Sequence, residues 1–422
     1  VATCVRWCVT YRVPPVARGG GHSYAGFSTT TGLLLDLRLL NAVAINRSTG
    51  ELTIGGAALN RDVFNTSLGG PLILPGGTCL GVGLGGLVLG GGIGYNTHWA
   101  GVTSDHLTAS RIVTASGDLL TINATEHPDL FWACRGGAGG SFGINTAFTF
   151  DLQPVPPGTV TYFRLDWRGA EAAKGVLATF DRILVDAPAQ LNAVAMAQAV
   201  PGNDPREAIA VMSRGHFLGS RADLLDLIAP LVKVGTPQRQ VEVMPFWDMQ
   251  KIWVTEETPT HSFGDTCRYA ARPLPGQATN DLVERLVACP HRSDTANGSI
   301  WSLGWVGGPV VDRFQPAETA YVHRNMLTLL RPTIVWPNGE DAAGAALQRW
   351  ADEMIAIMTP HTPHRSYQNF PNRALHDWAD AYYGENWERL VAVKTAYDKD
   401  NLFNNPQSVP PRSLMTALTG HR

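Results

Sequence analysis

Residues 76–94 read GGTCLGVGLGGLVLGGGIG and hold ten glycines in nineteen positions. Glycine loses more backbone freedom on folding than any other residue, so a helix or strand of this composition would be destabilised. The segment therefore predicts a loop whose backbone lies very close to a ligand. The bias extends around it, because 27 of the 44 glycines fall in the first 150 residues.

Two further glycine-rich clusters flank this stretch. Residues 18–26 read RGGGHSYAG and precede a strand expected at 33–37, and residues 129–144 read DLFWACRGGAGGSFGI. Each cluster offers backbone N–H groups that can converge on an anionic pyrophosphate without obstruction by side chains. A single loop of this kind is more often a tight turn, but three in this order are hard to explain as turns.

A dinucleotide-binding pattern, GxGxxG, is also present at Gly81, Gly83 and Gly86. Asp105 follows nineteen residues later, near where a ribose-binding acid is expected. The context disfavours this interpretation, because no buried strand leads into the turn and more glycines stand where the crossover helix should begin. Asp105 lies in a segment typical of a turn or helix cap. A nicotinamide-dependent dehydrogenase therefore stays as an alternative from a different class.

The overall composition is that of a globular protein with a large core. The chain has 422 residues, 44% hydrophobic and 16% charged, with a formal net charge of −3. These values exclude disorder and a coiled coil and argue against a nucleic-acid partner. No apolar run reaches ~18 residues, so no membrane span is expected. The six cysteines form no CxxC pair and HExxH is absent, so neither a metal site nor a disulfide scaffold is predicted.

Local patterns predict an α+β fold with more than one unit. Hairpins are expected at residues 42–55 and 111–122, each around a turn that contains serine and glycine. The proline-rich segment 152–158 marks a boundary, after which strands such as 192–199 alternate with amphipathic helices. The expected helices are 170–185, 221–234, 341–358, 377–383 and 386–397.

Motifs at the far end of the chain agree with the glycine-rich clusters. Residues 319–324 read TAYVHR, 367–370 read YQNF, 382–386 read YYGEN, 397–403 read YDKDNLF and 407–410 read QSVP. Together with the three clusters, they resemble the berberine-bridge-enzyme-like oxidases, a subgroup of the vanillyl-alcohol-oxidase flavoproteins. The resemblance covers nearly the whole chain and is specific at both ends.

The resemblance implies three parts. Residues 1–155 would form a PCMH-type FAD-binding domain that is short at its N-terminus, because the family has another strand–loop section before the helix expected near residue 1. Residues 156–365 would form a substrate-binding domain, an antiparallel sheet covered by helices. Residues 366–422 would return to the FAD-binding domain. No charged leader precedes the first helix, so no signal peptide is expected, and a soluble protein in either the cytoplasm or the exterior fits the sequence.

By the same resemblance, FAD is attached covalently, through His22 at its 8α-methyl carbon and through Cys79 at its C6 atom. A neutral imidazole and a thiolate are nucleophiles near neutral pH, which suits attack on an electrophilic ring. The implied cofactor-binding residues are His22, Cys79, Arg18, Gly19, Gly20, Gly21, Ser23, Gly26, Gly76, Gly77, Thr78, Val82, Gly86, Gly91, Gly92, Gly94, Gly139, Gly140, Ile144 and Asn369.

The proton acceptor beside the flavin is harder to assign. Two tyrosines that are common in the family are replaced here by Ile93 and Phe370. The remaining candidates are Tyr24, Tyr95, Tyr367 and Arg331. Tyr367 and Tyr24 are predicted to be catalytic, because their motifs place them beside the ring. Arg331 is expected at the surface, although it could lower the pKa of a phenol or bind a substrate anion.

These features predict an FAD-dependent oxidase that takes a hydride from an alcohol-type carbon of a sugar or natural product and reduces O2 to H2O2. Val82 matches a family position that gates oxygen, and its small side chain resembles the oxidases. The alternatives are an oxidative cyclase or amine oxidase of the same family and, from a different class, a non-catalytic flavin-binding protein. The expected partners are a small-molecule substrate and O2, without nucleic acid, membrane or metal, and no oligomeric state is predicted.

Overall fold

The N-terminal part of the chain builds a five-stranded antiparallel sheet beside a small parallel pair. The computed structural model describes residues 1–255 and 261–419. The elements are α1 (Ala2–Tyr11), the parallel pair β1 (Pro15–Arg18) and β2 (Leu33–Asp36), and the sheet strands β3 (Val43–Asn46), β4 (Glu51–Gly55), β6 (Leu107–Val113), β7 (Leu119–Asn123) and β8 (Ile144–Asp151). The larger sheet has the order β3-β4-β8-β6-β7. Both predicted hairpins are confirmed, as β3–β4 and β6–β7.

The glycine-rich stretch contains a short helix, α3 (Leu84–Leu89), which corrects the prediction of a loop throughout. A Cβ atom on Gly85 would lie 2.4 Å from the carbonyl oxygen of Gly56, so the helix approaches that backbone more closely than a side chain permits. Close packing thus offsets the conformational cost of glycine. The other short elements here are α2 (Asn60–Ser67), β5 (Leu72–Ile73), α4 (Thr97–Ala100), η1 (Thr103–His106), α5 (Pro128–Ala133) and β9 (Gln153–Pro154).

An eight-stranded antiparallel sheet spans residues 159–337. Its strands are β10 (Thr159–Arg168), β11 (Leu191–Ala199), β12 (Ile209–Phe217), β13 (Gln238–Pro245), β14 (His261–Asp265), β15 (Arg268–Ala270), β16 (Asn297–Leu303) and β17 (Thr328–Pro337). The order is β13-β10-β12-β11-β16-β17-β14, and β15 also pairs with β17. β17 therefore lies inside the sheet, and its Arg331 stands opposite Trp301 of β16.

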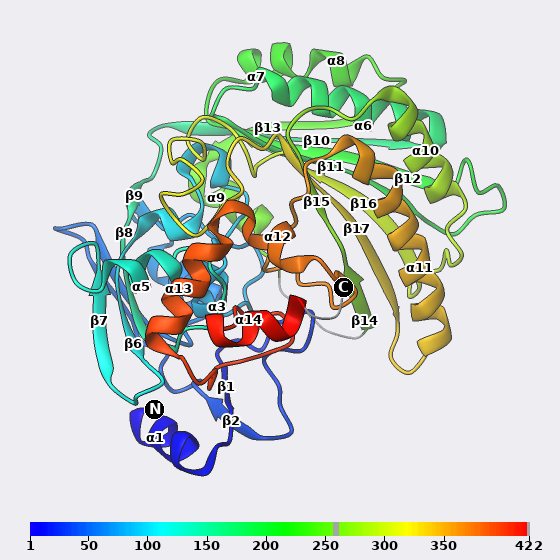
Figure 1. Cartoon of the computed structure of the whole chain (residues 1–422). Coiled ribbons are helices and arrows are strands. Elements are labelled where there is room, and N and C mark those ends of the chain that lie inside the picture. Colours follow the sequence, from blue (N-terminus) through cyan, green and yellow to red (C-terminus); the bar gives the residue numbers. More distant parts are fainter. Residues whose placement is uncertain (256–260, 420–422) are drawn as a thin grey trace.

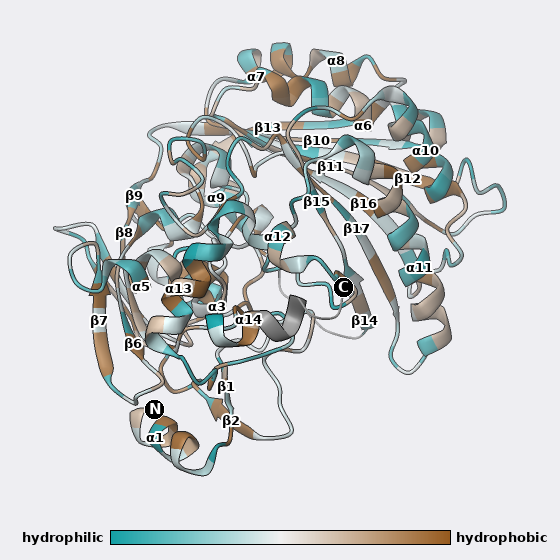
Figure 2. Cartoon of the chain, in the orientation of Figure 1, coloured by the Kyte–Doolittle hydropathy of each residue, from teal (hydrophilic) through white to brown (hydrophobic). Residues whose placement is uncertain are grey.

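Helices cover one face of the eight-stranded sheet (Figure 1). They are α6 (Ala170–Val185), α10 (Gly276–Val287) and α11 (Asp341–Met358), with α7 (Arg221–Leu227) and α8 (Ala229–Val232) beside them, while α9 (Phe246–Trp253) packs on other side chains of the sheet. The covering helices carry both hydrophilic and hydrophobic residues (Figure 2), as burial of one side requires. Within residues 1–255 and 261–419, no helix is both long and apolar enough to span a membrane.

The helix predicted over 221–234 is interrupted. It consists of α7 and α8, with Ile228 between them, and Pro230 stands in the first turn of α8. Proline lacks an N–H group and its ring clashes with the preceding turn of a helix. It is therefore tolerated in the first turn of a helix but interrupts a helix that would continue past it. The helices predicted at 170–185 and 341–358 are confirmed with the same bounds.

The C-terminal residues return to the N-terminal sheet (Figure 1). Their elements are η2 (Thr359–His361), α12 (Trp378–Tyr383), η3 (Gly384–Asn386), α13 (Trp387–Tyr397) and α14 (Arg412–Thr419). Leu390 of α13 is buried in one cluster with Phe148 of β8. The ammonium group of Lys394 donates to the carbonyl oxygen of Ser141 at 2.6 Å and pairs with the Asp398 carboxylate at 2.6 Å. The hydrogen bond to Ser141 thus ties α13 to the third glycine-rich cluster.

Candidate active site

A cavity of about 430 Å³ is bounded by the glycine-rich loops, the eight-stranded sheet and the C-terminal segment. The predicted cofactor-binding residues that line it are Gly19, Gly20, Gly21, His22, Ser23, Gly77, Thr78, Cys79, Val82, Gly86, Gly94, Gly139, Gly140, Ile144 and Asn369. Tyr24 and Tyr367, the predicted catalytic residues, line the same cavity. The structure thus brings residues from all three clusters together with the YQNF motif.

Five predicted cofactor-binding residues lie outside this lining. They are Arg18, Gly26, Gly76, Gly91 and Gly92. Arg18 forms an ion pair with Asp36 at 3.0 Å. A Cβ atom on Gly91 would lie 2.5 Å from the ring of Tyr321, and the N–H group of Gly92 donates to the Tyr367 hydroxyl at 3.0 Å. In the structure these residues contact other parts of the chain.

At some glycines of the lining, the backbone is free of neighbouring side chains and is accessible to a flat anionic cofactor. A Cβ atom on Gly86 would meet nothing within 4 Å, and one on Gly139 would meet only a side-chain carbon of Leu89 at 3.6 Å. Elsewhere the loops touch backbone to backbone, since a Cβ atom on Gly20 would lie 2.3 Å from the nitrogen of Gly83. Exposed backbone N–H groups held by such packing can bind a pyrophosphate. The residues present therefore fit FAD.

Two threonine hydroxyl groups lie close to the Cys79 sulfur. The Thr255 hydroxyl donates to Cys79 Sγ at 3.6 Å, and the Thr78 hydroxyl lies 3.7 Å from it. Thr255 and Cys79 form a parallel β-bridge, in which the Leu80 N–H donates to the Thr255 carbonyl at 3.0 Å. The residues after α9 thus fix the Cys79 loop, while His22 reaches the same cavity from another loop. Donors of this kind favour a thiolate.

Arg331 lies in the cavity wall, which corrects the expectation of a surface position. It stands directly opposite Trp301 of β16, and cross-strand partners point to the same face of a sheet, so both side chains face the cavity. Arg331 Nη2 pairs with the carboxylate of Asp265, whose side chain is fully buried. The guanidinium carbon lies 4.4 Å from the centre of the Phe370 ring. Tyr24 stacks on Phe370 at 5.5 Å, and Phe263 meets Tyr24 edge-on at 4.7 Å.

The Tyr367 hydroxyl receives two hydrogen bonds. The Gly92 N–H and the Asn369 amide each donate to it at 3.0 Å. Asn369 also donates to the carbonyl oxygen of Leu87 at 2.9 Å, so the motif is anchored on the glycine-rich segment. Burial raises the pKa of Tyr367 to about 12, although both donors oppose this rise because they stabilise the phenolate.

Comparison with known proteins matches both ends of the chain. The family model described as FAD binding domain matches residues 1–123, and the one described as Berberine and berberine like matches residues 366–410. The FAD-linked oxidoreductase YgaK of Bacillus subtilis is 32% identical over 97% of this chain and 89% of its own. The chain belongs to the berberine-bridge-enzyme-like family of FAD-linked oxidoreductases.

Further members of the family agree with this assignment. Glucooligosaccharide oxidase of Sarocladium strictum is 28% identical over 97% of this chain and 85% of its own length. The solved structure of Physcomitrella patens BBE-like 1 superposes with a TM-score of 0.83 at 25% identity, covering 97% of this chain and 89% of that chain. The predicted α+β fold of PCMH type and the prediction of an FAD-dependent oxidoreductase are confirmed.

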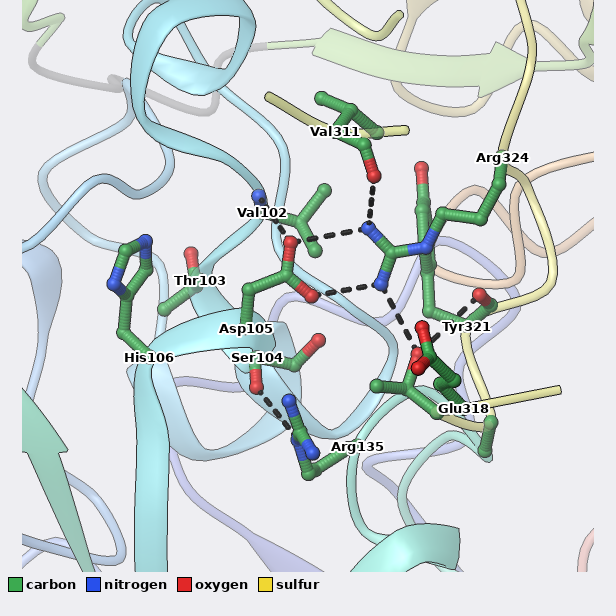
Figure 3. Close-up of polar contacts among 12 residues, drawn as sticks. Val102, Thr103, Ser104, Asp105, His106, Arg135, Val311, Glu318, Tyr321 and Arg324 are labelled. Atoms are coloured by element: carbon green, nitrogen blue, oxygen red, sulfur yellow. Dashed lines mark hydrogen bonds and ion pairs between the residues drawn. The ribbon is translucent and has the colours of Figure 1, made fainter. Parts of the chain in front are cut away.

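In this berberine-bridge-enzyme-like chain, Asp105 is committed to an ion pair and cannot serve as a ribose-binding acid. Its Oδ1 accepts from Arg324 Nη2 at 2.7 Å and its Oδ2 from Arg324 Nη1 at 3.0 Å (Figure 3). Both side chains are fully buried. The glycine pattern before Asp105 leads into α3, which is only six residues long, rather than into a crossover helix. The nicotinamide-dependent alternative thus loses both features on which it depended.

The sequence analysis named Tyr95 as a candidate proton acceptor but missed the aromatic and cationic side chains around it. Tyr95 lines the cavity and stacks on Trp253 with 3.8 Å between ring centres. Arg214 Nη2 donates to the Tyr95 hydroxyl at 3.2 Å, and its guanidinium lies 4.9 Å from the Trp253 ring. Burial raises the pKa of Tyr95, and Arg214 opposes that rise. No local signal connects Arg214 with Tyr95, because the two residues are 119 positions apart in the sequence.

Proposed function

We propose that this chain is an oxidase that takes a hydride from an alcohol-type carbon of a sugar or natural product and passes the electrons to O2, giving H2O2. In this proposal FAD is held covalently through His22 and Cys79. One observation carries it: the two nucleophiles come from different glycine-rich loops and line a single cavity with Tyr24 and Tyr367. The relative named glucooligosaccharide oxidase supports a sugar-type alcohol as the substrate class.

The two proposed attachment residues contribute different atoms to the bonds with FAD. When bound, FAD supplies the hydride acceptor and the site of O2 reduction. His22 offers an imidazole nitrogen for one bond, and Cys79 offers its sulfur for the other. The hydroxyls of Thr255 and Thr78 lie against the Cys79 sulfur and stabilise its anionic form.

Tyr367 and Tyr24 are proposed to accept the proton of the substrate hydroxyl. Tyr367 is held in place by the Gly92 N–H and the Asn369 amide, which also stabilise its phenolate. Tyr24 is oriented by stacking on the Phe370 ring. The Arg331 guanidinium packs against that same ring. A positive charge near a phenol favours loss of its proton.

The proposal predicts a visible outcome for purified protein. After acid precipitation the pellet should remain yellow, and the intact mass should exceed that of the chain by one FAD. The photoreduced protein should then be reoxidised by air with release of one H2O2 for each flavin. A colourless pellet with a yellow supernatant would exclude covalent attachment, and reoxidation that produces no H2O2 would exclude the oxidase.

A further inference from the structure

Arg331 is the one residue with a permanent charge among the described residues that line the cavity. The lining within residues 1–255 and 261–419 includes no Asp, Glu or Lys. Building on the function proposed above, we propose that the substrate is an alcohol that carries a carboxylate, and that Arg331 binds this carboxylate. The assignment would narrow the substrate class from alcohols in general to hydroxylated acids.

The donors of Arg331 are only partly used within the chain. Nη2 donates to Asp265, whereas Nη1 makes no hydrogen bond to the described residues and the buried Nε has no partner there. The side chain is 21% exposed and that of Asp265 is fully buried. Asp265 also accepts from the Thr333 hydroxyl at 2.6 Å, so it is held beneath the guanidinium. A ligand in the cavity therefore meets the guanidinium rather than the carboxylate.

These unused donors point to a planar anion as the ligand. A guanidinium presents N–H groups in a rigid fork that matches the two oxygens of a carboxylate. Phe370 packs on one face of the group at 4.4 Å and limits its motion, so less side-chain entropy is lost when a ligand binds. Nη1 is the donor that a ligand in the cavity can reach, because it has no partner among the described residues and, unlike Nε, is not buried.

The walls around Arg331 favour a substrate with a ring. Trp301, Trp305 and Tyr24 line the cavity, and Trp301 stands directly opposite Arg331 on the neighbouring strand. Flat aromatic walls suit either a sugar ring or an aromatic ring. A sugar acid and an aromatic hydroxy acid therefore share the chemistry that this site would recognise. In either case the alcohol carbon loses a hydride and its hydroxyl a proton, and O2 takes up both as H2O2.

Binding is tested on the flavin-loaded enzyme with a matched pair of probes. The visible spectrum of the flavin is titrated with benzoate and with benzamide, which share a shape but not a charge. We expect benzoate to bind about 10- to 100-fold more tightly, as a charge-assisted hydrogen bond implies. Arg331→Gln should abolish this preference, and Arg331→Lys should retain part of it. Arg164→Gln is the control, because Arg164 lies in the same sheet, pairs with Asp166 and does not line the cavity.

Turnover distinguishes the two sources of the carboxylate. Glucuronate is compared with glucose, and mandelate with 1-phenylethane-1,2-diol, by kcat/KM for O2 consumption. Preference for glucuronate assigns a sugar acid, and preference for mandelate assigns an aromatic hydroxy acid. The inference is overturned if benzoate binds no better than benzamide, if a neutral member is preferred in turnover, or if the preference survives in Arg331→Gln. Such failures leave covalent flavin and H2O2 formation in place, whereas failure of the proposed function removes them.

Discussion

At the scale of single residues, His22 and Cys79, the two proposed points of attachment, come from different loops and line the same cavity. We expect His22→Ala and Cys79→Ala each to retain flavin after acid precipitation. The double variant should release it, since no covalent bond then remains. Intact mass before and after denaturation measures this directly. Cys134→Ala is the matched control, because Cys134 is fully buried outside the cavity and its pKa is raised to about 12 by burial.

An unchanged adduct spectrum in Cys79→Ala would contradict attachment at two points.

A related expectation concerns Thr255, whose hydroxyl donates to the Cys79 sulfur. Loss of a donor to a thiolate raises the thiol pKa, so the proposed thioether should depend on this contact while the proposed bond to His22 should not. The chemistry proposed for Cys79 would therefore depend on a residue 176 positions away in the sequence.

The Tyr367 hydroxyl is expected to accept the substrate proton during flavin reduction. A positioned base contributes about 10²–10⁴ in rate, so Tyr367→Phe should slow anaerobic flavin reduction by that order, with a smaller effect for Tyr24→Phe. Burial raises the pKa of Tyr367 to about 12, so the phenolate fraction grows as pH rises. The rate of flavin reduction should therefore climb with alkalinity in the wild type and lose that slope in Tyr367→Phe.

Stopped-flow absorbance at a series of pH values measures this effect, with flavin content as the check on folding. Tyr162→Phe is the control, because this phenol is buried beside α9 and does not line the cavity. If Tyr367→Phe changes the rate by only a few-fold, the tyrosine packs and positions without moving a proton. Tyr95, with Arg214 at its hydroxyl, would then be the next residue to test.

At the scale of elements, α3 contains two adjacent glycines with opposite surroundings. A Cβ atom on Gly85 would lie 2.4 Å from the Gly56 carbonyl oxygen, whereas one on Gly86 would meet nothing within 4 Å. Gly85→Ala should lower the free energy of unfolding by about 1–3 kcal/mol through overpacking. Gly86→Ala should leave it unchanged or raise it by up to about 1 kcal/mol through helix propensity.

Urea unfolding of the flavin-free proteins compares the two variants. Because Gly86 lines the cavity, Gly86→Ala should also weaken flavin incorporation although the fold is intact. Equal stability of the two variants would mean that α3 can move away from Gly56, and that the glycines are not required by packing. The pair thus separates glycines that serve the fold from those that leave room for FAD.

The sequence predicted those elements whose signal is local. The spacing of apolar residues predicted α6 and α11 with the bounds that the structure shows, and the turns that contain serine and glycine predicted the two hairpins. It missed α3 because the close approach to Gly56 that makes glycine favourable there is a tertiary contact. Arg331 was misplaced for a similar reason, since its partner Asp265 lies 66 residues earlier on another strand. Cavity residues were found where they lie in a recognisable motif, either a glycine-rich cluster or the YQNF segment.

At the scale of the whole molecule, one buried ion pair connects the N-terminal part with the loop before β17 (Figure 3). Asp105 belongs to η1, which follows the glycine-rich segment and α4, and Arg324 lies just before β17. Arg324 also donates to the carbonyl oxygen of Val311 at 2.9 Å and to the Thr319 hydroxyl at 3.0 Å. Both charges in this contact are desolvated, and the cost of desolvation is offset by their mutual attraction only when both partners are present.

Removing one partner should therefore cost more than removing both. Arg324→Met leaves the Asp105 carboxylate buried without its cation, and we expect it to lower the free energy of unfolding by about 3–5 kcal/mol. The double variant Asp105→Asn/Arg324→Met removes the unpaired charge and should recover part of that loss. Lys251→Met is the control: its pair with Asp248 has side chains 54% and 55% exposed, and breaking it should cost at most about 1 kcal/mol. Denaturant unfolding of the four proteins decides the matter, and a double variant less stable than Arg324→Met would show that Asp105 holds the two parts together without Arg324.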